Sequence, residues 1–252
     1  MPELPAFLSP DSPHHSSLIM LLLLIGFAVL HSGGAALRQR AESIVGARIW
    51  RLLFAGLSLP AAIVIIGYFL AHRYDGYRVW NFQGLPGVIP VVWILTAVSF
   101  LFLYPATYNI LEIPAVLQPQ FRLYDMGIIR ISRHPQAIGQ ILWCFAHAFW
   151  IGSSFMLITC VGLIGHHLFG VWHGDRRLRK RFGHLFEGLQ RSTSIVPFLA
   201  VLDGRQRLVW QEFVRPAQLG IAVTVGVFWW AHRYISAASL IFLQSSLGKL
   251  LS

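Results

Sequence analysis

Long apolar runs separated by short polar segments dominate this sequence. Uncharged stretches cover residues 12–37, 52–72, 79–111, 134–174 and 216–232. A helix needs about 20 apolar residues to cross a bilayer. The fourth run is long enough for two helices, because Gly152, Ser153 and Ser154 supply a turn within it. The pattern predicts an all-α integral membrane protein with six membrane-spanning helices, at about residues 17–36, 51–71, 85–105, 135–151, 155–173 and 217–234.

Composition supports a membrane protein and argues against an ordinary soluble enzyme. Hydrophobic residues make up 56% of the chain and charged residues 12%, whereas soluble domains carry about 25% charged residues. We interpret the net charge of +10 as the Lys and Arg excess of cytoplasmic loops, and not as a sign of nucleic-acid binding. Cys144 and Cys160 both lie in apolar runs, so no disulfide framework is expected.

The distribution of Lys and Arg predicts the orientation. With six spans, sixteen of the 20 basic residues fall on one side of the membrane and four on the other. Because Lys and Arg accumulate on the cytoplasmic side, both termini should be outside or lumenal. Residues 1–16 are then a short lumenal tail without the features of a signal or transit peptide. Residues 17–235 form the transmembrane domain, and 236–252 form a C-terminal tail.

Residues 174–216 form the one substantial aqueous segment, a basic loop on the cytoplasmic or stromal side. Its start, Asp175–Phe182, has helical spacing and five cations. We expect this segment to lie on the membrane surface, with its cations facing anionic headgroups. Contact with a nucleotide or a cofactor is the alternative.

Histidines are the main candidates for chemistry. The chain has 11 of them, and a polar group in hydrocarbon is costly unless it is paired. His31 and His147 lie well inside the spans on different helices, and two such imidazoles can hold a haem iron from opposite faces. Cys144 shares a helix face with His147 and is a possible alternative ligand. The alternative is that each histidine only hydrogen-bonds a neighbouring helix.

A second constellation, Arg133-His134-Pro135-Gln136, stands at the expected start of the fourth span. Pro135 suits the first turn of a helix, so Arg133 and His134 would lie at its positive end, where an anion is favoured. Glu112 and Asp125 are the expected countercharges. The simpler alternative is an interfacial arginine that reaches towards headgroups.

Several ordered blocks resemble one known family. They include His31-Ser32-Gly33, His72-Arg73-Tyr74-Asp75-Gly76, Arg133-His134-Pro135-Gln136, Trp143-Cys144-Phe145-Ala146-His147, His166-His167-Leu168-Phe169-Gly170 and Asp203-Gly204-Arg205-Gln206. Over residues 20–210 the chain resembles the NnrU-domain family of 15-cis-ζ-carotene isomerases of cyanobacteria and plants.

That resemblance implies a membrane isomerase with haem b. It would convert the 15-cis double bond of 9,15,9'-tri-cis-ζ-carotene to give 9,9'-di-cis-ζ-carotene. The family pattern places the axial ligands at His31 and His147, with Cys144 as a catalytic alternate ligand. His72, His134 and His166 match the family's other histidines, and we expect them, with Arg133, to be cofactor-binding residues.

The resemblance further implies partners and a location. The expected partners are ζ-carotene, membrane lipid, carotene desaturases and an electron donor, and the expected location is the thylakoid or plasma membrane of a cyanobacterium.

Two other functions stay open at this point. Arg133-His134-Pro135 with Gly139, together with Leu178, Phe182, Gly183 and Phe186, more distantly resembles membrane methyltransferases that use S-adenosylmethionine. Asp175-Arg176 and Gln136-Ala137 depart from the methyltransferase pattern. The third possibility is a non-enzymatic accessory protein of nitrogen-oxide metabolism.

Overall fold

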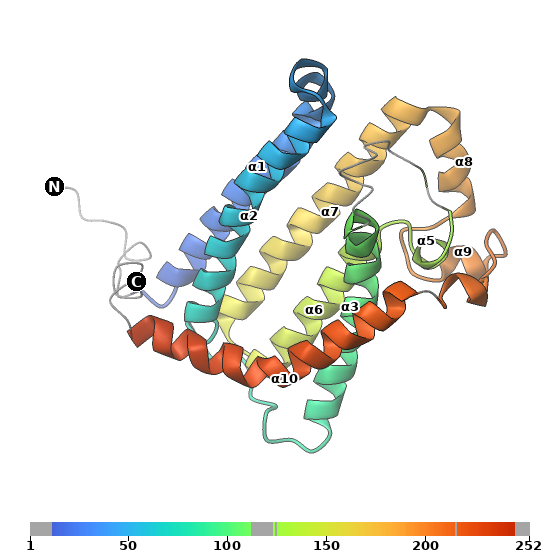
Figure 1. Cartoon of the computed structure of the whole chain (residues 1–252). Coiled ribbons are helices and arrows are strands. Elements are labelled where there is room, and N and C mark those ends of the chain that lie inside the picture. Colours follow the sequence, from blue (N-terminus) through green and yellow to red (C-terminus); the bar gives the residue numbers. More distant parts are fainter. Residues whose placement is uncertain (1–11, 112–122, 124, 215, 245–252) are drawn as a thin grey trace.

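Helices form nearly all the regular structure of the protein. The computed structural model describes residues 12–111, 123, 125–214 and 216–244. Its long helices form a bundle, and its short helices gather at one end (Figure 1). The elements are α1 (His15–Val45), α2 (Ala47–His72), α3 (Val88–Leu111), α5 (Ile128–Ile131), α6 (Pro135–Ile151), α7 (Ser154–Phe182), α8 (His184–Ser192), α9 (Leu199–Leu202), the 3-10 turn η2 (Trp210–Glu212) and α10 (Pro216–Gln244). The predicted all-α class is confirmed for these residues.

Helix α7 occupies the middle of the bundle. It packs against α1 on one side and against α6 on the other, while α2 lies beside α1 and α3 lies beside α6 (Figure 1). Helix α10 runs across the bundle and contacts α2 and α3. Residues carried by α7 can therefore meet residues of both α1 and α6.

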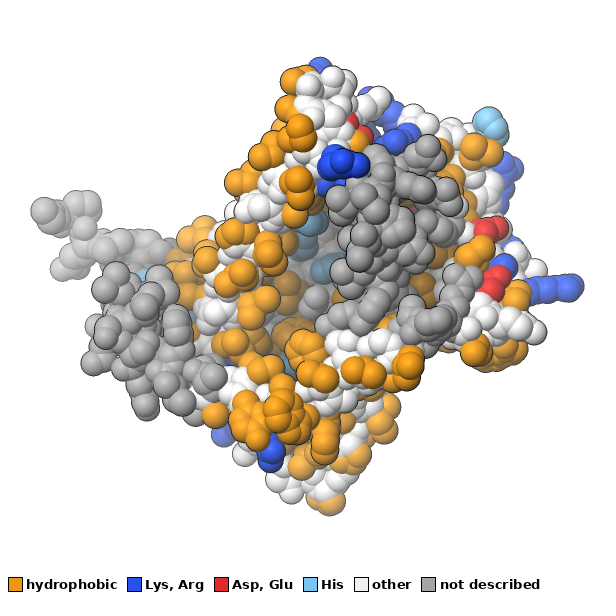
Figure 2. Space-filling view, viewed as in Figure 1, with side chains coloured by type: hydrophobic (Ala, Val, Ile, Leu, Met, Phe, Trp, Pro, Cys, Tyr) orange, Lys and Arg blue, Asp and Glu red, His pale blue; other side chains and the backbone are white. Residues whose placement is uncertain are grey.

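The long helices expose apolar side chains, as expected for contact with lipid. Among the described residues, three helices are long and apolar enough to cross a membrane, namely α1, α2 and α7. Leu22 is 60% exposed and Val161 is 71% exposed, and hydrophobic side chains cover much of the face in Figure 2. The protein is thus a helical membrane protein, and the further spans of the six stay a prediction.

The predicted helix positions agree with the structure better than the predicted helix ends do. Five of the six expected spans lie within a helix, and the third begins three residues before α3. The main difference is in the basic segment. Helix α7 continues without a break through residues 174–182, about 13 Å of additional rise. These cations therefore extend the helix axis and do not form a separate surface helix, because no proline or turn residue interrupts Asp175–Phe182.

The predicted turn between the fourth and fifth spans is confirmed. Gly152 adopts a left-handed conformation with φ of 67°, which glycine tolerates because it has no Cβ. Ser153 Oγ accepts a hydrogen bond from Met156 N at 3.0 Å and thereby caps α7. The segment after α2 packs onto this turn, with Val79 N donating to Gly152 O at 2.7 Å.

Trp80 fixes the same segment to the end of α6. Its indole Nε1 donates to Ala148 O at 3.0 Å. We expect Trp80→Phe to lower the free energy of unfolding by about 1 kcal/mol, because the carbonyl loses this donor while an aromatic ring is kept. Thermal unfolding in one detergent, followed by circular dichroism, measures the change. Trp210→Phe is the control, since Trp210 is 71% exposed; equal midpoints for the two variants would contradict the prediction.

Small buried clusters hold α7 to its neighbours. Cys144 and Ile151 of α6 pack against Met156 and Cys160 of α7. On the opposite side, Met20 and Leu24 of α1 pack against Phe155 of α7. Both clusters lie towards the Gly152 end of α7, and the candidate site lies towards its other end.

Candidate functional site

The start of α6 is held by a segment that lies far along the chain. Arg133 N donates to Ser194 O at 2.8 Å, and Ser132 Oγ donates to Ile195 O at 2.7 Å. Pro135 occupies the first turn of α6, as predicted, and His134 immediately precedes it. The backbone of Arg133 and His134 is therefore fixed between the α6 start and the segment after α8.

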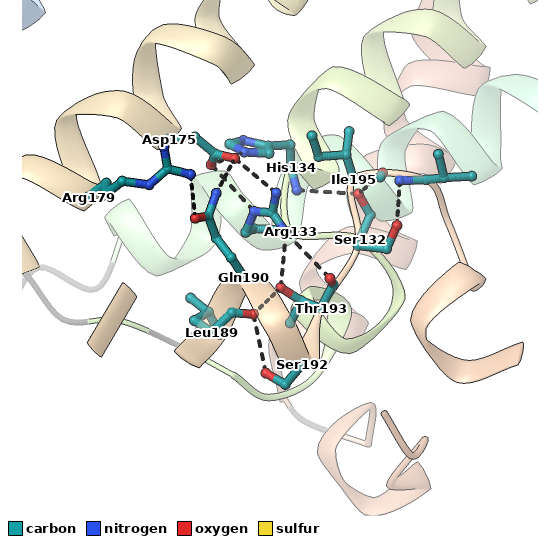
Figure 3. Close-up of polar contacts among 12 residues, drawn as sticks. Ser132, Arg133, His134, Asp175, Arg179, Leu189, Gln190, Ser192, Thr193 and Ile195 are labelled. Carbon is teal, nitrogen blue, oxygen red and sulfur yellow. Dashed lines mark hydrogen bonds and ion pairs between the residues drawn. The ribbon is translucent and has the colours of Figure 1, made fainter. Parts of the chain in front are cut away.

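Asp175 of α7 joins both of these side chains (Figure 3). Its Oδ2 lies 2.9 Å from Arg133 Nη2, and its Oδ1 lies 2.7 Å from His134 Nε2. Gln190 Nε2 of α8 donates to Asp175 Oδ2 at 3.1 Å, and Arg133 Nη1 donates to Thr193 Oγ1 at 3.2 Å. A carboxylate only accepts hydrogen bonds, so His134 carries its proton on Nε2. We call these five residues the Asp175 network.

The countercharge of Arg133 differs from the one expected from the sequence. Asp175 lies 42 residues from Arg133 and takes this role. Of the two expected acids, Glu112 lies outside the described residues, and Asp125 has its favourable interaction with Arg130. The nearest acid in sequence is not the nearest in space, because α6 and α7 are antiparallel and bring Asp175 back to the start of α6.

A second ion pair holds the segment before α6. Arg130 Nε and Nη2 contact the two carboxylate oxygens of Glu212 at 2.7 and 2.8 Å, and Arg130 Nη1 donates to Gln206 Oε1 at 2.7 Å. Hydrogen bonding to Glu212 raises the pKa of the Arg130 guanidinium above its usual range. This clamp joins α5 to η2 and fixes the segment that leads into the Asp175 network.

A cavity of about 390 Å³ adjoins the network between α1, α6 and α7. Three of the predicted site histidines and the predicted arginine line it, along with residues that the sequence analysis did not single out. Its lining includes His31, Ser32, Ala35, Arg133, His134, Gln136, His166, His167, Gly170, His173 and Arg177. The structure therefore brings His31, Arg133, His134 and His166 together around one space.

His31 and His166 face each other across the α1–α7 interface. Their ring centroids are 6.2 Å apart, and Phe27 contacts both rings. The Nδ1 atoms of both are buried and have no hydrogen-bond partner among the described residues. Because buried polar atoms are rarely left unpaired, these two nitrogens are candidates for ligand binding.

His147 and Cys144 lie on α6, and neither is among the residues that line this cavity. His147 Nδ1 lies 2.9 Å from Trp143 O, and the two rings stack with centroids 3.9 Å apart. Cys144 is 1% exposed, and Cys160 Sγ donates to Cys144 O at 3.5 Å. From that contact, α6 runs in one direction to His147 and α7 runs in the opposite direction to His166. At a helical rise of about 1.5 Å per residue, the two histidines are about 13 Å apart along the bundle axis.

His72 lies at the other end of the bundle. Its Nδ1 is 2.8 Å from Asp75 Oδ2, and its ring lies against Tyr68 with centroids 4.2 Å apart. The predicted site residues thus occupy three places: the cavity, the half of α6 nearest Gly152 and the end of α2. The predicted site residues did not include Asp175, His173 or Arg177. The spacing of His166, Gly170, His173 and Arg177 nevertheless places them on one helix face.

A family model that matches most of the chain shows which family the chain belongs to. The model of the family described as NnrU protein matches residues 19–239, which include every site residue described above. The chain belongs to the NnrU family. No solved structure matches this NnrU protein significantly.

Two curated relatives are similar to this NnrU protein. One is the chloroplastic 15-cis-zeta-carotene isomerase of Zea mays, 50% identical over 225 residues, which is 88% of this chain. The other is the chloroplastic 15-cis-zeta-carotene isomerase of Arabidopsis thaliana, 50% identical over 224 residues, or 87% of this chain. The chain spans 61% of the length of each relative.

Proposed function

We propose that this NnrU protein is an isomerase that converts the 15-cis double bond of 9,15,9'-tri-cis-ζ-carotene to trans. The main support is the 50% identity over nearly nine tenths of the chain to two enzymes named for that isomerisation. The exposed apolar helices also suit a substrate that dissolves in lipid. In Figure 2, histidine side chains are visible in a hollow bordered by hydrophobic side chains.

We further propose haem b as the cofactor, whose iron His31 and His147 would hold. His31 fits this role, because it lines the cavity and its Nδ1 atom has no partner among the described residues. His147 lies about 13 Å farther along the bundle axis, so the two imidazoles would hold one iron only if α6 and α7 shifted relative to each other. The described residues contain no cluster of three or more His, Cys, Asp or Glu placed to hold a metal ion, whereas haem needs only axial protein ligands because the porphyrin supplies the rest. Haem, when bound, would supply a redox-active iron, and electron exchange with such a centre can transiently lower the order of a double bond.

The protein's own side chains would orient the cofactor. Hydrogen bonding to Trp143 O places the proton of His147 on Nδ1 and leaves the Nε2 lone pair available. His31 Nδ1 has no partner within the described ranges, so its ring is not committed to another contact. Cys144, one turn before His147 and buried, is the proposed alternate ligand.

We also propose the six-span topology, with both termini on the outer or lumenal side. Helices α3, α6 and α10 would join α1, α2 and α7 as spans. Many Lys and Arg side chains gather at the end of the bundle that carries α8 (Figure 2), which agrees with a cytoplasmic or stromal location of that end.

The activity is tested in a carotenoid-producing host that is blocked at this isomerisation. We expect the wild-type chain to restore 9,9'-di-cis-ζ-carotene, measured by chromatography, and to carry haem in its reduced-minus-oxidised spectrum. His31→Ala and His147→Ala should lose both properties. His184→Ala, an exposed change on α8, is the control and should keep both.

The outcomes separate the candidate functions. A wild-type protein that leaves the tri-cis substrate unchanged would overturn the isomerase proposal and favour the accessory role. Normal haem content in the His31→Ala, His147→Ala double variant would overturn the ligand assignment. Binding of S-adenosylmethionine in equilibrium dialysis, without isomerisation, would favour the methyltransferase alternative.

A further inference from the structure

The cavity has a cationic end that the proposed isomerase function does not assign. His166, Gly170, His173 and Arg177 follow one face of α7 at intervals of four, three and four residues, and all line the cavity. A Cβ added at Gly170 would meet no atom within 4 Å, so this face of α7 borders open space. The cavity therefore runs from the His31–His166 pair towards Arg177.

Arg177 differs from the other arginine of the cavity in its partners. Arg133 is paired with Asp175 at 2.9 Å. Arg177 Nη1 donates to a backbone carbonyl, Ala35 O, at 2.8 Å, and none of the described carboxylates forms an ion pair with it. No Asp or Glu is among the described lining residues either. Since a guanidinium has five N–H donors, Arg177 keeps donors and an unneutralised charge for a ligand.

The same contact fixes the height of Arg177 relative to His31. Ala35 follows His31 by four residues on α1, so the guanidinium lies about one helical turn, roughly 6 Å, beyond the His31 backbone. The cavity thus offers the His31 imidazole at one level and the Arg177 guanidinium about one helical turn farther along α1. A ligand that has a metal ion at its centre and a carboxylate on its edge would match the His31 imidazole and the Arg177 guanidinium, respectively.

We propose that Arg177 binds a propionate carboxylate of the haem whose iron His31 holds. This inference rests on the proposed haem cofactor and assigns its orientation, with the acidic edge towards the charged end of α7. A guanidinium and a carboxylate form paired, charge-assisted hydrogen bonds. A phosphate of a lipid headgroup has similar chemistry, so the test must distinguish these two anions.

The test compares Arg177→Gln with Arg176→Gln in the full-length purified protein. Both changes remove one exposed positive charge from α7. Arg177 lines the cavity, whereas Arg176 lies over the Trp172 ring, 5.7 Å from its centroid, and is not among the lining residues. Each protein is loaded with haem b or with haem dimethyl ester, in which both carboxylates are neutral. The rate of transfer to apomyoglobin, followed by the Soret band, gives the dissociation rate.

We expect Arg177→Gln to release haem b about ten- to a hundredfold faster than wild type, because a charged hydrogen-bond partner is lost. Arg176→Gln should match wild type. With the dimethyl ester, wild type and Arg177→Gln should release at the same rate, because the arginine then has no carboxylate to bind.

Each of the other outcomes overturns a defined part of the proposal. Equal release of haem b by the two variants would overturn the Arg177 assignment and leave the haem proposal intact. A loss in Arg177→Gln that is equal for haem and its ester would show a packing role or lipid binding instead. A wild-type protein that takes up no haem would overturn the cofactor proposal and this inference together.

Discussion

Asp175→Asn should strongly destabilise the protein, because it breaks a largely buried ion pair between α6 and α7. Asp175 and Arg133 have side chains that are 13% and 9% exposed. Removing one charge of such a pair leaves the other without compensation, which costs about 3–5 kcal/mol. His134 and Gln190 lose their charged acceptor as well. The lowered midpoint of thermal unfolding in detergent, followed by circular dichroism, measures this effect.

A matched control is available in a second Asp–Arg pair. Asp203 contacts Arg205 at 2.6 Å, but this pair is exposed, and ion pairs in water contribute little. Asp203→Asn should therefore leave the midpoint close to that of wild type. If the two variants unfolded at the same temperature, the Asp175 network would have no special role in holding α6, α7 and α8 together.

Gly139→Ala should separate α3 from α6. A Cβ at this position would lie 2.8 Å from both Leu103 N and Ser99 O and 2.6 Å from Leu103 Cγ. Two of these atoms belong to the α3 backbone, so a side-chain rotation cannot relieve the clash and the helices must shift. Overpacking of this kind costs about 1–3 kcal/mol. The midpoint of thermal unfolding should fall accordingly.

Gly165→Ala provides the comparison for this change. A Cβ at Gly165 on α7 would meet no atom within 4 Å, and alanine favours the helix more than glycine does. Its midpoint should be equal to or slightly above that of wild type. A Gly139→Ala protein that behaved like Gly165→Ala would mean that α3 and α6 do not approach as closely as the distances from Gly139 to Leu103 and Ser99 indicate.

The fold class followed from the lengths of the apolar runs, whereas the helix ends did not. Hydropathy detects where a segment leaves lipid, and charged residues such as those of 174–182 are good helix formers that can continue the helix into water. For this reason α7 ends at Phe182 and not near residue 173. The Gly152 turn was predictable because its signal is local.

The site was predictable in its residue types but not in its contacts. His31, His134 and Arg133 stood out because polar groups at membrane depth or at a helix start need partners. Their partners depend on how antiparallel helices are aligned, and a single sequence does not contain that information. Thus Asp175 was overlooked as the partner of Arg133, and the pairing of His31 with His147 stays a prediction.

The continuity of α7 has a mechanical consequence. One unbroken helix carries Cys160 beside Cys144, His166 beside His31 and Asp175 beside Arg133. A sliding motion of this helix along its axis would displace all three contacts by the same distance. A partner that displaced the basic residues 176–181 along the helix axis would therefore change the surroundings of His166 and Cys160 at the same time.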